Sequence, residues 1–152
     1  MKKRTLLSIL GAVYALGMLW LLFHRAPHAA ADGYWRSLPA YVNPVPFRTV
    51  FRLARAVLRA PGAPRAASYL ANLLGNVLLF VPAGFFLPAL WKKERRYGVF
   101  LLTAAGMILL LETAQLFTLL GFFDVDDLIL NLLGMSAGFL LFRLFAGKKK
   151  SG

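Results

Sequence analysis

Eight polar residues of this chain lie inside or next to long apolar stretches. Carboxyl and amide side chains are costly in lipid unless they are paired, so their positions indicate where chemistry is located. Three pairs among them are spaced three or four residues apart, which places both members of each pair on one face of a helix. The eight residues are Asn72, Asn76, Glu112, Gln115, Asp124, Asp126, Asp127 and Asn131.

Glu112 has the clearest chemical signature of the eight. It is the only Asp, Glu, Lys or Arg in the apolar run that starts at Tyr97, so no cation in that run neutralises it. We therefore expect its carboxyl group to be protonated, or to be hydrogen-bonded to Asn72, Asn76 or Gln115. A carboxyl group held in this way is typical of a general acid or base, a proton relay or a ligand-binding group.

Nucleophilic catalysis has little support in the sequence. The chain has no Cys, which excludes disulfides, thiolate nucleophiles and thiolate metal sites. Ser68 and Ser136 are hydroxyl candidates, but neither has a partner His in the sequence. Whether the protein is an enzyme stays open, with Glu112 as the candidate catalytic residue.

Metal binding is also weakly supported. His24 and His28 are four residues apart, but Pro27 stands between them at the end of an apolar run, so we expect no ligation there. Asp126 and Asp127 offer oxygen ligands suited to Mg²⁺ or Ca²⁺. We predict no bound metal and no cofactor, and we keep these two carboxylates as the alternative.

The composition identifies the class of protein. The 152 residues are 59% apolar and 16% charged, whereas soluble domains average about 45–50% and about 25%. Four apolar runs reach the length of about 20 residues that a helix needs to cross a bilayer. We predict an all-α integral membrane protein, in which residues 1–152 form one domain built as a four-helix transmembrane bundle. The predicted spans are residues 5–23, 67–91, 97–123 and 128–146.

Basic residues set the predicted orientation and partner. The formal net charge is +12, and ten of the 18 Lys and Arg fall at residues 2–4, 92–96 and 148–150, on one side of the four spans. The positive-inside rule makes this side cytoplasmic. We therefore predict a protein of the cell membrane whose two termini are cytoplasmic and whose loop 24–66 is extracytoplasmic, although this loop carries seven arginines. Basic residues placed between apolar blocks favour membrane lipid over nucleic acid as the partner.

The first apolar run has a second interpretation as a cleaved signal peptide. It follows basic residues, and Ala29 to Ala31 offer a small-residue cleavage site. A run of nineteen residues is longer than the usual apolar core of a signal peptide, so we expect the span to be retained.

The outer loop contains a predicted amphipathic helix at about residues 47–60, ended by Pro61 and Gly62. One face is apolar and consists of Phe47, Val50, Phe51, Ala54, Val57 and Leu58. Another face consists of Arg48, Arg52, Arg55 and Arg59. We expect an extracytoplasmic helix in the headgroup plane whose arginines contact lipid phosphates, or alternatively a phosphate of a substrate.

The eight polar residues fall at one depth of the bundle, in its outer half. The inner part of the second span, residues 81–91, has only apolar residues, Pro and Gly. We therefore infer a polar pocket open to the outside, although membrane amides such as Asn72 and Asn76 often only bond neighbouring helices. Pro82 and Pro88 predict a kink in the second span.

Gly134 and Gly138 form a GxxxG face on the fourth span. Small residues at this spacing let two helices approach closely, so the face predicts either packing within the chain or a homo-oligomer.

Four separated motifs resemble the VanZ-like family of small bacterial membrane proteins. They are residues 43–48 (NPVPFR), 72–88 (NLLGNVLLFVPAGFFLP), 112–115 (ETAQ) and 124–134 (DVDDLILNLLG), and the resemblance covers residues 43–142. It implies a common site at the eight polar positions. It also implies an Arg shortly before the acidic motif, where this chain has Gly121, Phe122 and Phe123. The family's namesake is linked to low-level teicoplanin resistance, without a settled biochemical activity.

Three functions remain open. The first is a cell-envelope module whose acidic pocket holds an amphiphile, such as a lipoglycopeptide or a lipid-linked wall precursor, and so contributes to antibiotic resistance. The second is an enzyme on a lipid-linked envelope substrate with Glu112 as acid or base. The third is a proton-linked transporter, which four helices would form only as an oligomer.

Overall fold

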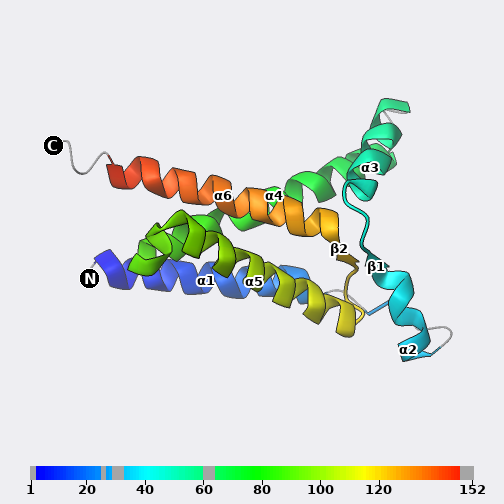
Figure 1. Ribbon diagram of the computed structural model, residues 1–152, viewed down its shortest axis with the longest axis horizontal. Helices are drawn as coiled ribbons and strands as arrows, with labels where there is room; N and C mark the ends of the chain where they lie inside the picture. The colour runs from blue at the N-terminus through cyan, green and yellow to red at the C-terminus, as the bar shows by residue number, and fades with distance from the viewer. Residues whose placement is uncertain (1–2, 25–26, 29–32, 60–63, 148–152) are drawn as a thin grey trace.

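The computed structural model describes residues 3–24, 27–28, 33–59 and 64–147. Four long helices run side by side along its length (Figure 1). They are α1 (Lys3–Phe23), α4 (Pro64–Leu90), α5 (Tyr97–Phe117) and α6 (Val125–Gly147). Each is long and apolar enough to cross a membrane, which confirms the predicted all-α membrane class with four candidate spans.

Some sequence predictions concern residues that lie outside the described part. These residues are Lys2, the alanines 29–31, Pro61, Gly62 and the lysines 148–150.

The third and fourth spans have different bounds from those predicted. Helix α5 ends at Phe117, because the chain turns at Leu119, which has a left-handed φ of 55°. The amides of Leu120 and Gly121 then donate to the Gln115 carbonyl at 3.0 and 3.3 Å. Helix α6 begins at Val125. The predicted acidic turn is therefore partly the first turn of α6, where carboxylates are favoured by the helix dipole.

The described connecting segments contain six shorter elements, and of these the apolar periodicity of the sequence indicated only the helix at residues 48–59. They are α2 (Tyr34–Ser37), η1 (Leu38–Tyr41), β1 (Val42–Asn43), α3 (Arg48–Arg59), η2 (Lys92–Arg95) and β2 (Phe123–Asp124). β1 and β2 pair in parallel, with Val42 opposite Phe123 and Asn43 opposite Asp124. This pairing fastens the 24–66 loop to the start of α6. We call this end of the bundle, opposite both termini, the loop end (Figure 1).

Helix α3 forms within the predicted range and has an exposed apolar face. Thr49 and Leu53 are buried on its inner side. Phe51 and Leu58 are 63% and 81% exposed, whereas Val50 and Val57 are half-buried, so the described residues cover only part of the predicted apolar face. Such a face suits a helix that lies on a bilayer surface. Its extracytoplasmic location stays a prediction.

The closest helix pair of the bundle is α4 and α6, which meet through three glycines. A Cβ added at Gly84 would lie 1.9 Å from the Met135 carbonyl oxygen, and one at Gly138 would lie 1.9 Å from that of Val81. Gly134 is equally close to α4, at 2.1 Å from a carbonyl oxygen. The predicted GxxxG face is thus used for packing within the chain, and a homo-oligomer stays an untested prediction. Helix α4 runs through Pro82 and Pro88 without interruption.

Helix α1 packs on α4 toward the end of the bundle that carries the termini. Gly11 lies against the side chains of Phe86 and Leu90, which a Cβ there would approach to 3.4–3.5 Å. The Tyr14 hydroxyl donates a hydrogen bond of 2.5 Å to the Leu79 carbonyl. Met18 joins the buried core. These contacts hold α1 against the other three helices.

Replacing Tyr14 with Phe is expected to lower the free energy of unfolding by about 1 kcal/mol, because the Leu79 carbonyl loses its interhelical donor. Thermal denaturation of the purified protein in detergent measures this change. Tyr97→Phe is the control, since that hydroxyl makes a longer, exposed contact of 3.2 Å with Ser136. A larger effect at Tyr97 than at Tyr14 would contradict the prediction.

Candidate functional site

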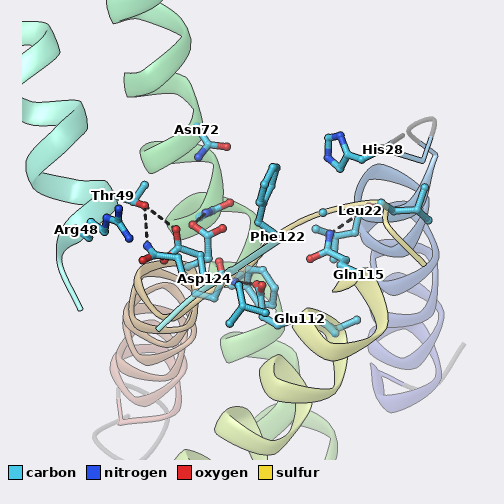
Figure 2. A pocket seen from close by; sticks show the side chains of 18 of the residues that line it. Leu22, His28, Arg48, Thr49, Asn72, Glu112, Gln115, Phe122 and Asp124 are labelled. Atoms are coloured by element: carbon cyan, nitrogen blue, oxygen red, sulfur yellow. Dashed lines mark hydrogen bonds between the residues drawn. The ribbon is translucent and has the colours of Figure 1, made fainter. Parts of the chain in front are cut away.

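A cavity of about 610 Å³ lies at the loop end of the bundle (Figure 2). Residues of α1, α3, α4, α5, α6, both short strands and the turn after α5 line it. Seven of the eight sequence-predicted site residues are in its wall: Asn72, Asn76, Glu112, Gln115, Asp124, Asp127 and Asn131. The sequence indicated only that these side chains lie at the same depth on three spans. The structure shows that they line one cavity.

Glu112 and Asn131 form a buried pair in the cavity wall. Their side chains are 4% and 3% exposed. The Asn131 amide donates to Glu112 Oε1 at 3.3 Å, whereas Glu112 Oε2 and Asn131 Oδ1 have no hydrogen-bond partner among the described residues. A buried acceptor without a donor costs about 1–3 kcal/mol. This pair can therefore accept hydrogen bonds from a group that enters the cavity.

The predicted partners of Glu112 have other roles. Asn76 of α4 donates to Asp127 Oδ1 of α6 at 2.5 Å. Gln115 donates to the Leu22 carbonyl at 3.2 Å and so holds the end of α1 against α5. Asn72 is exposed at the edge of the cavity (Figure 2). Of the two alternatives predicted for Glu112, the hydrogen bond to one of these amides was wrong, because Asn131 of α6 is its bonded partner, and protonation of the carboxyl group stays a prediction.

Asp124 fastens the loop to the bundle. Its carboxylate accepts from the Thr49 hydroxyl at 2.6 Å and from the Asn43 amide at 3.1 Å. It also accepts from the backbone amide of Asp126 at 2.9 Å. Three donors surround this carboxylate, so its charge is satisfied within the protein.

Asp126 lies outside the cavity and caps helix α3. It is 1% exposed. Its two oxygens accept from the backbone amides of Phe47, of Thr49 at 2.7 Å and of Val50 at 3.0 Å. These are orphan donors at the start of α3, so Asp126 is the N-cap carboxylate of a helix distant in sequence. Among the predicted site residues it alone has this purely structural position.

The structure gives no support to the alternative metal site at Asp126 and Asp127. Within the described residues there is no group of three or more His, Cys, Asp or Glu that could hold a metal ion. Both Asp126 oxygens are already bound by backbone amides.

Arg48 and Arg52 line the cavity, and the sequence analysis did not place them in the pocket. They are one turn apart at the start of α3 and exposed, and neither guanidinium group has an ion pair or hydrogen bond within the described part of the chain. Arg55 and Arg59, farther along α3, do not line it. The spacing of the arginines indicated a cationic face. Asp126 bonds the start of α3, which is the end of the helix that carries the two cavity-lining arginines.

An aromatic cluster closes the α5 side of the site. The rings of His28, Tyr41 and Phe122 lie with centroids 5.0–5.4 Å apart. The His28 backbone amide donates to the Leu119 carbonyl at 2.7 Å. Phe122 thus occupies the segment where the family resemblance implies an Arg, and in this chain the cations come from α3 instead.

Residues 11–146 match the model of the VanZ/LLP1 family. The matched segment contains every residue that lines the cavity. No curated protein and no solved structure matches the chain. Because the family match covers nearly the whole sequence, the chain belongs to the VanZ/LLP1 family.

Proposed function

We propose that this protein binds a membrane amphiphile in the cavity at the loop end, and that it thereby protects the cell envelope against the lipoglycopeptide teicoplanin. In this proposal the loop end faces the outside of a bacterial cell membrane, as the distribution of Lys and Arg favours. The ligand is an envelope lipid, a lipid-linked wall precursor or the lipoglycopeptide itself.

The observation that carries the proposal is that three of the four buried side-chain atoms without a hydrogen-bond partner in the described residues belong to cavity-lining residues, Asn43, Glu112 and Asn131; the fourth is on Glu94. Native proteins leave few buried acceptors without a donor, and those that remain require an explanation. A carboxyl group with only a packing role is expected to have hydrogen-bond donors for both oxygens within the protein, as Asp124 has. Glu112 instead presents a free oxygen beside a cavity, which is typical of a binding site.

The cavity has the size and mixed lining that an amphiphile requires. Its volume of about 610 Å³ falls within the range of about 300–1,000 Å³ for small-ligand sites. Leu21, Leu22 and Phe80 line it alongside the carboxylates and amides. A ligand with a polar head and an apolar tail can therefore satisfy both parts of the lining.

Deletion of the protein is expected to increase susceptibility to teicoplanin, and Glu112→Gln is expected to fail to restore the wild-type level. Gln keeps the size of the side chain but replaces one carboxyl oxygen with an NH2 group, so the site loses an acceptor oxygen and can no longer ionise. The measurement is the inhibitory concentration in a deletion strain complemented with each variant, with expression verified by immunoblot.

Glu94→Gln is the matched control, because it makes the same chemical change in η2, outside the cavity lining. Restoration by wild type and Glu94→Gln but not by Glu112→Gln supports the proposal. Equal restoration by all three proteins would show that Glu112 only packs. An unchanged susceptibility of the deletion strain would refute the role in teicoplanin protection.

A further inference from the structure

We infer that the ligand of the cavity is a lipid whose headgroup carries both a phosphate and a primary ammonium group. The inference rests on the proposed function and specifies its ligand class. It comes from two features that the cavity places together: a pair of unpaired arginines from α3, and a pair of unpaired acceptor oxygens from α5 and α6.

The phosphate end is defined by Arg48 and Arg52. Both guanidinium groups border the cavity without a carboxylate partner in the described residues. Two arginines one helical turn apart can each donate a pair of hydrogen bonds to a phosphate, which matches their planar geometry. Asp124 and Asp126, the two carboxylates that bond the start of α3, are occupied by Thr49 and other donors of the loop. The arginines therefore keep their charge for an incoming anion.

The ammonium end is defined by Glu112, Asn131 and Asp127. Two of them offer unpaired buried oxygens, and Asp127 adds a second carboxylate that is bonded only to the Asn76 amide in the described structure. The α4, α5 and α6 residues that line the cavity include no Lys or Arg. A primary ammonium group supplies three N–H donors and a positive charge, so it satisfies both the unpaired acceptors and the carboxylates.

Other headgroups leave part of this arrangement unsatisfied. A quaternary choline has the positive charge but no N–H donor for the oxygen of Asn131. A glycerol headgroup has hydroxyl donors but no positive charge for the two carboxylates. Figure 2 places Arg48 on the α3 side of the cavity and Glu112 on the α5 side, so a phosphate and an amine on one headgroup can be held at different walls.

The experiment is native mass spectrometry of the full-length protein in mixed micelles. The micelles contain equal amounts of phosphatidylethanolamine, phosphatidylcholine and phosphatidylglycerol with identical acyl chains. We expect phosphatidylethanolamine to be retained about tenfold more than the other two lipids, as one additional charge-assisted contact would give. Lipid that co-purifies from cells is identified by its mass, which distinguishes an aminophospholipid from a lipid-linked wall precursor carrying phosphate and amine.

Two double variants of α3 separate the site from general charge effects. Arg48→Ala with Arg52→Ala is expected to reduce retention of all three phospholipids about tenfold or more, because each loses its phosphate contacts. Arg55→Ala with Arg59→Ala removes the same charge from the same helix outside the cavity, where only surface contacts to headgroups are expected, and should reduce retention much less. Equal losses in both double variants would overturn the assignment of the phosphate end.

Glu112→Gln tests the ammonium end. It is expected to abolish the preference for phosphatidylethanolamine over phosphatidylcholine while phosphate-dependent retention persists, and an unchanged preference would overturn this assignment. The outcome is separable from the proposed function. Restored teicoplanin protection without headgroup preference would refute only the ligand class, whereas headgroup preference without any susceptibility phenotype would refute only the protective role.

Discussion

Replacing Gly138 with Ala is expected to destabilise the protein by at least about 3 kcal/mol, because the new methyl group meets backbone that cannot rotate away. Its Cβ would lie 1.9 Å from the Val81 carbonyl oxygen and 2.8 Å from the Phe85 amide nitrogen. Helices α4 and α6 would have to separate, and the contacts of Met135 and Phe139 in the core would loosen with them. Chemical or thermal denaturation in detergent measures the loss.

Gly106→Ala is the matched control for this prediction. Gly106 lies in α5, and an added Cβ there has no heavy atom within 4 Å. In the interior of a helix this change is expected to be neutral, or stabilising by about 0.5–1 kcal/mol, since glycine is a poor helix former. Equal stability of Gly138→Ala and Gly106→Ala would show that the α4–α6 contact is looser than its geometry indicates. A matching loss at Gly84, which faces Met135, would support the same contact from the other helix.

The spans and most of the cavity wall were predictable because both depend on the free-energy cost of placing polar groups in lipid. Apolar runs long enough to cross a bilayer are visible in composition, and polar groups within them are costly unless they are paired. Glu112, Asp127 and Asn131 could therefore be assigned to one depth before the helices were placed. The hydrogen bonds among these residues were not predictable, because they depend on which face each helix turns toward Glu112. In the structure the partner of Glu112 is Asn131 of α6 and not an amide of α4.

The attachment of the loop could not be predicted from the sequence. Asp126 and Thr49 are 77 residues apart, so neither periodicity nor a local capping motif connects them. The aspartates were predicted to line the pocket because they fall at the depth of the other polar residues and within a motif of the resembling family. Since successive residues of a helix point in different directions, Asp127 faces Asn76 and the cavity while Asp126 faces α3. The same contact holds the start of α3, where Arg48 and Arg52 line the cavity.

Replacing Asp126 with Ala is expected to detach the start of α3 from the bundle. The substitution leaves the backbone amides of Phe47, Thr49 and Val50 without their acceptor. Loss of a capping side chain costs about 0.5–2 kcal/mol, and unsatisfied buried donors increase that cost. We expect a total of about 3 kcal/mol, expressed as local opening of the loop end, because the α4–α6 contact does not involve this residue.

Limited trypsin digestion in membranes measures the opening, because α3 carries four arginines as cleavage sites. Asp126→Ala is expected to be cut within α3 about a hundredfold faster than wild type, in proportion to the population of the open form. Asp126→Asn keeps one acceptor oxygen and should be cut at an intermediate rate. Asn72→Ala removes an exposed polar side chain of α4 and should be cut at the wild-type rate.

The same variant also tests how α3 serves the cavity. If Asp126 positions Arg48 and Arg52 without touching the ligand, Asp126→Ala should weaken phospholipid retention and leave the preference between headgroups intact, since Glu112 and Asn131 are undisturbed. Glu112→Gln should do the reverse. Wild-type digestion of Asp126→Ala would contradict the cap. Lost headgroup preference in that variant would instead show that the two ends of the cavity do not act independently.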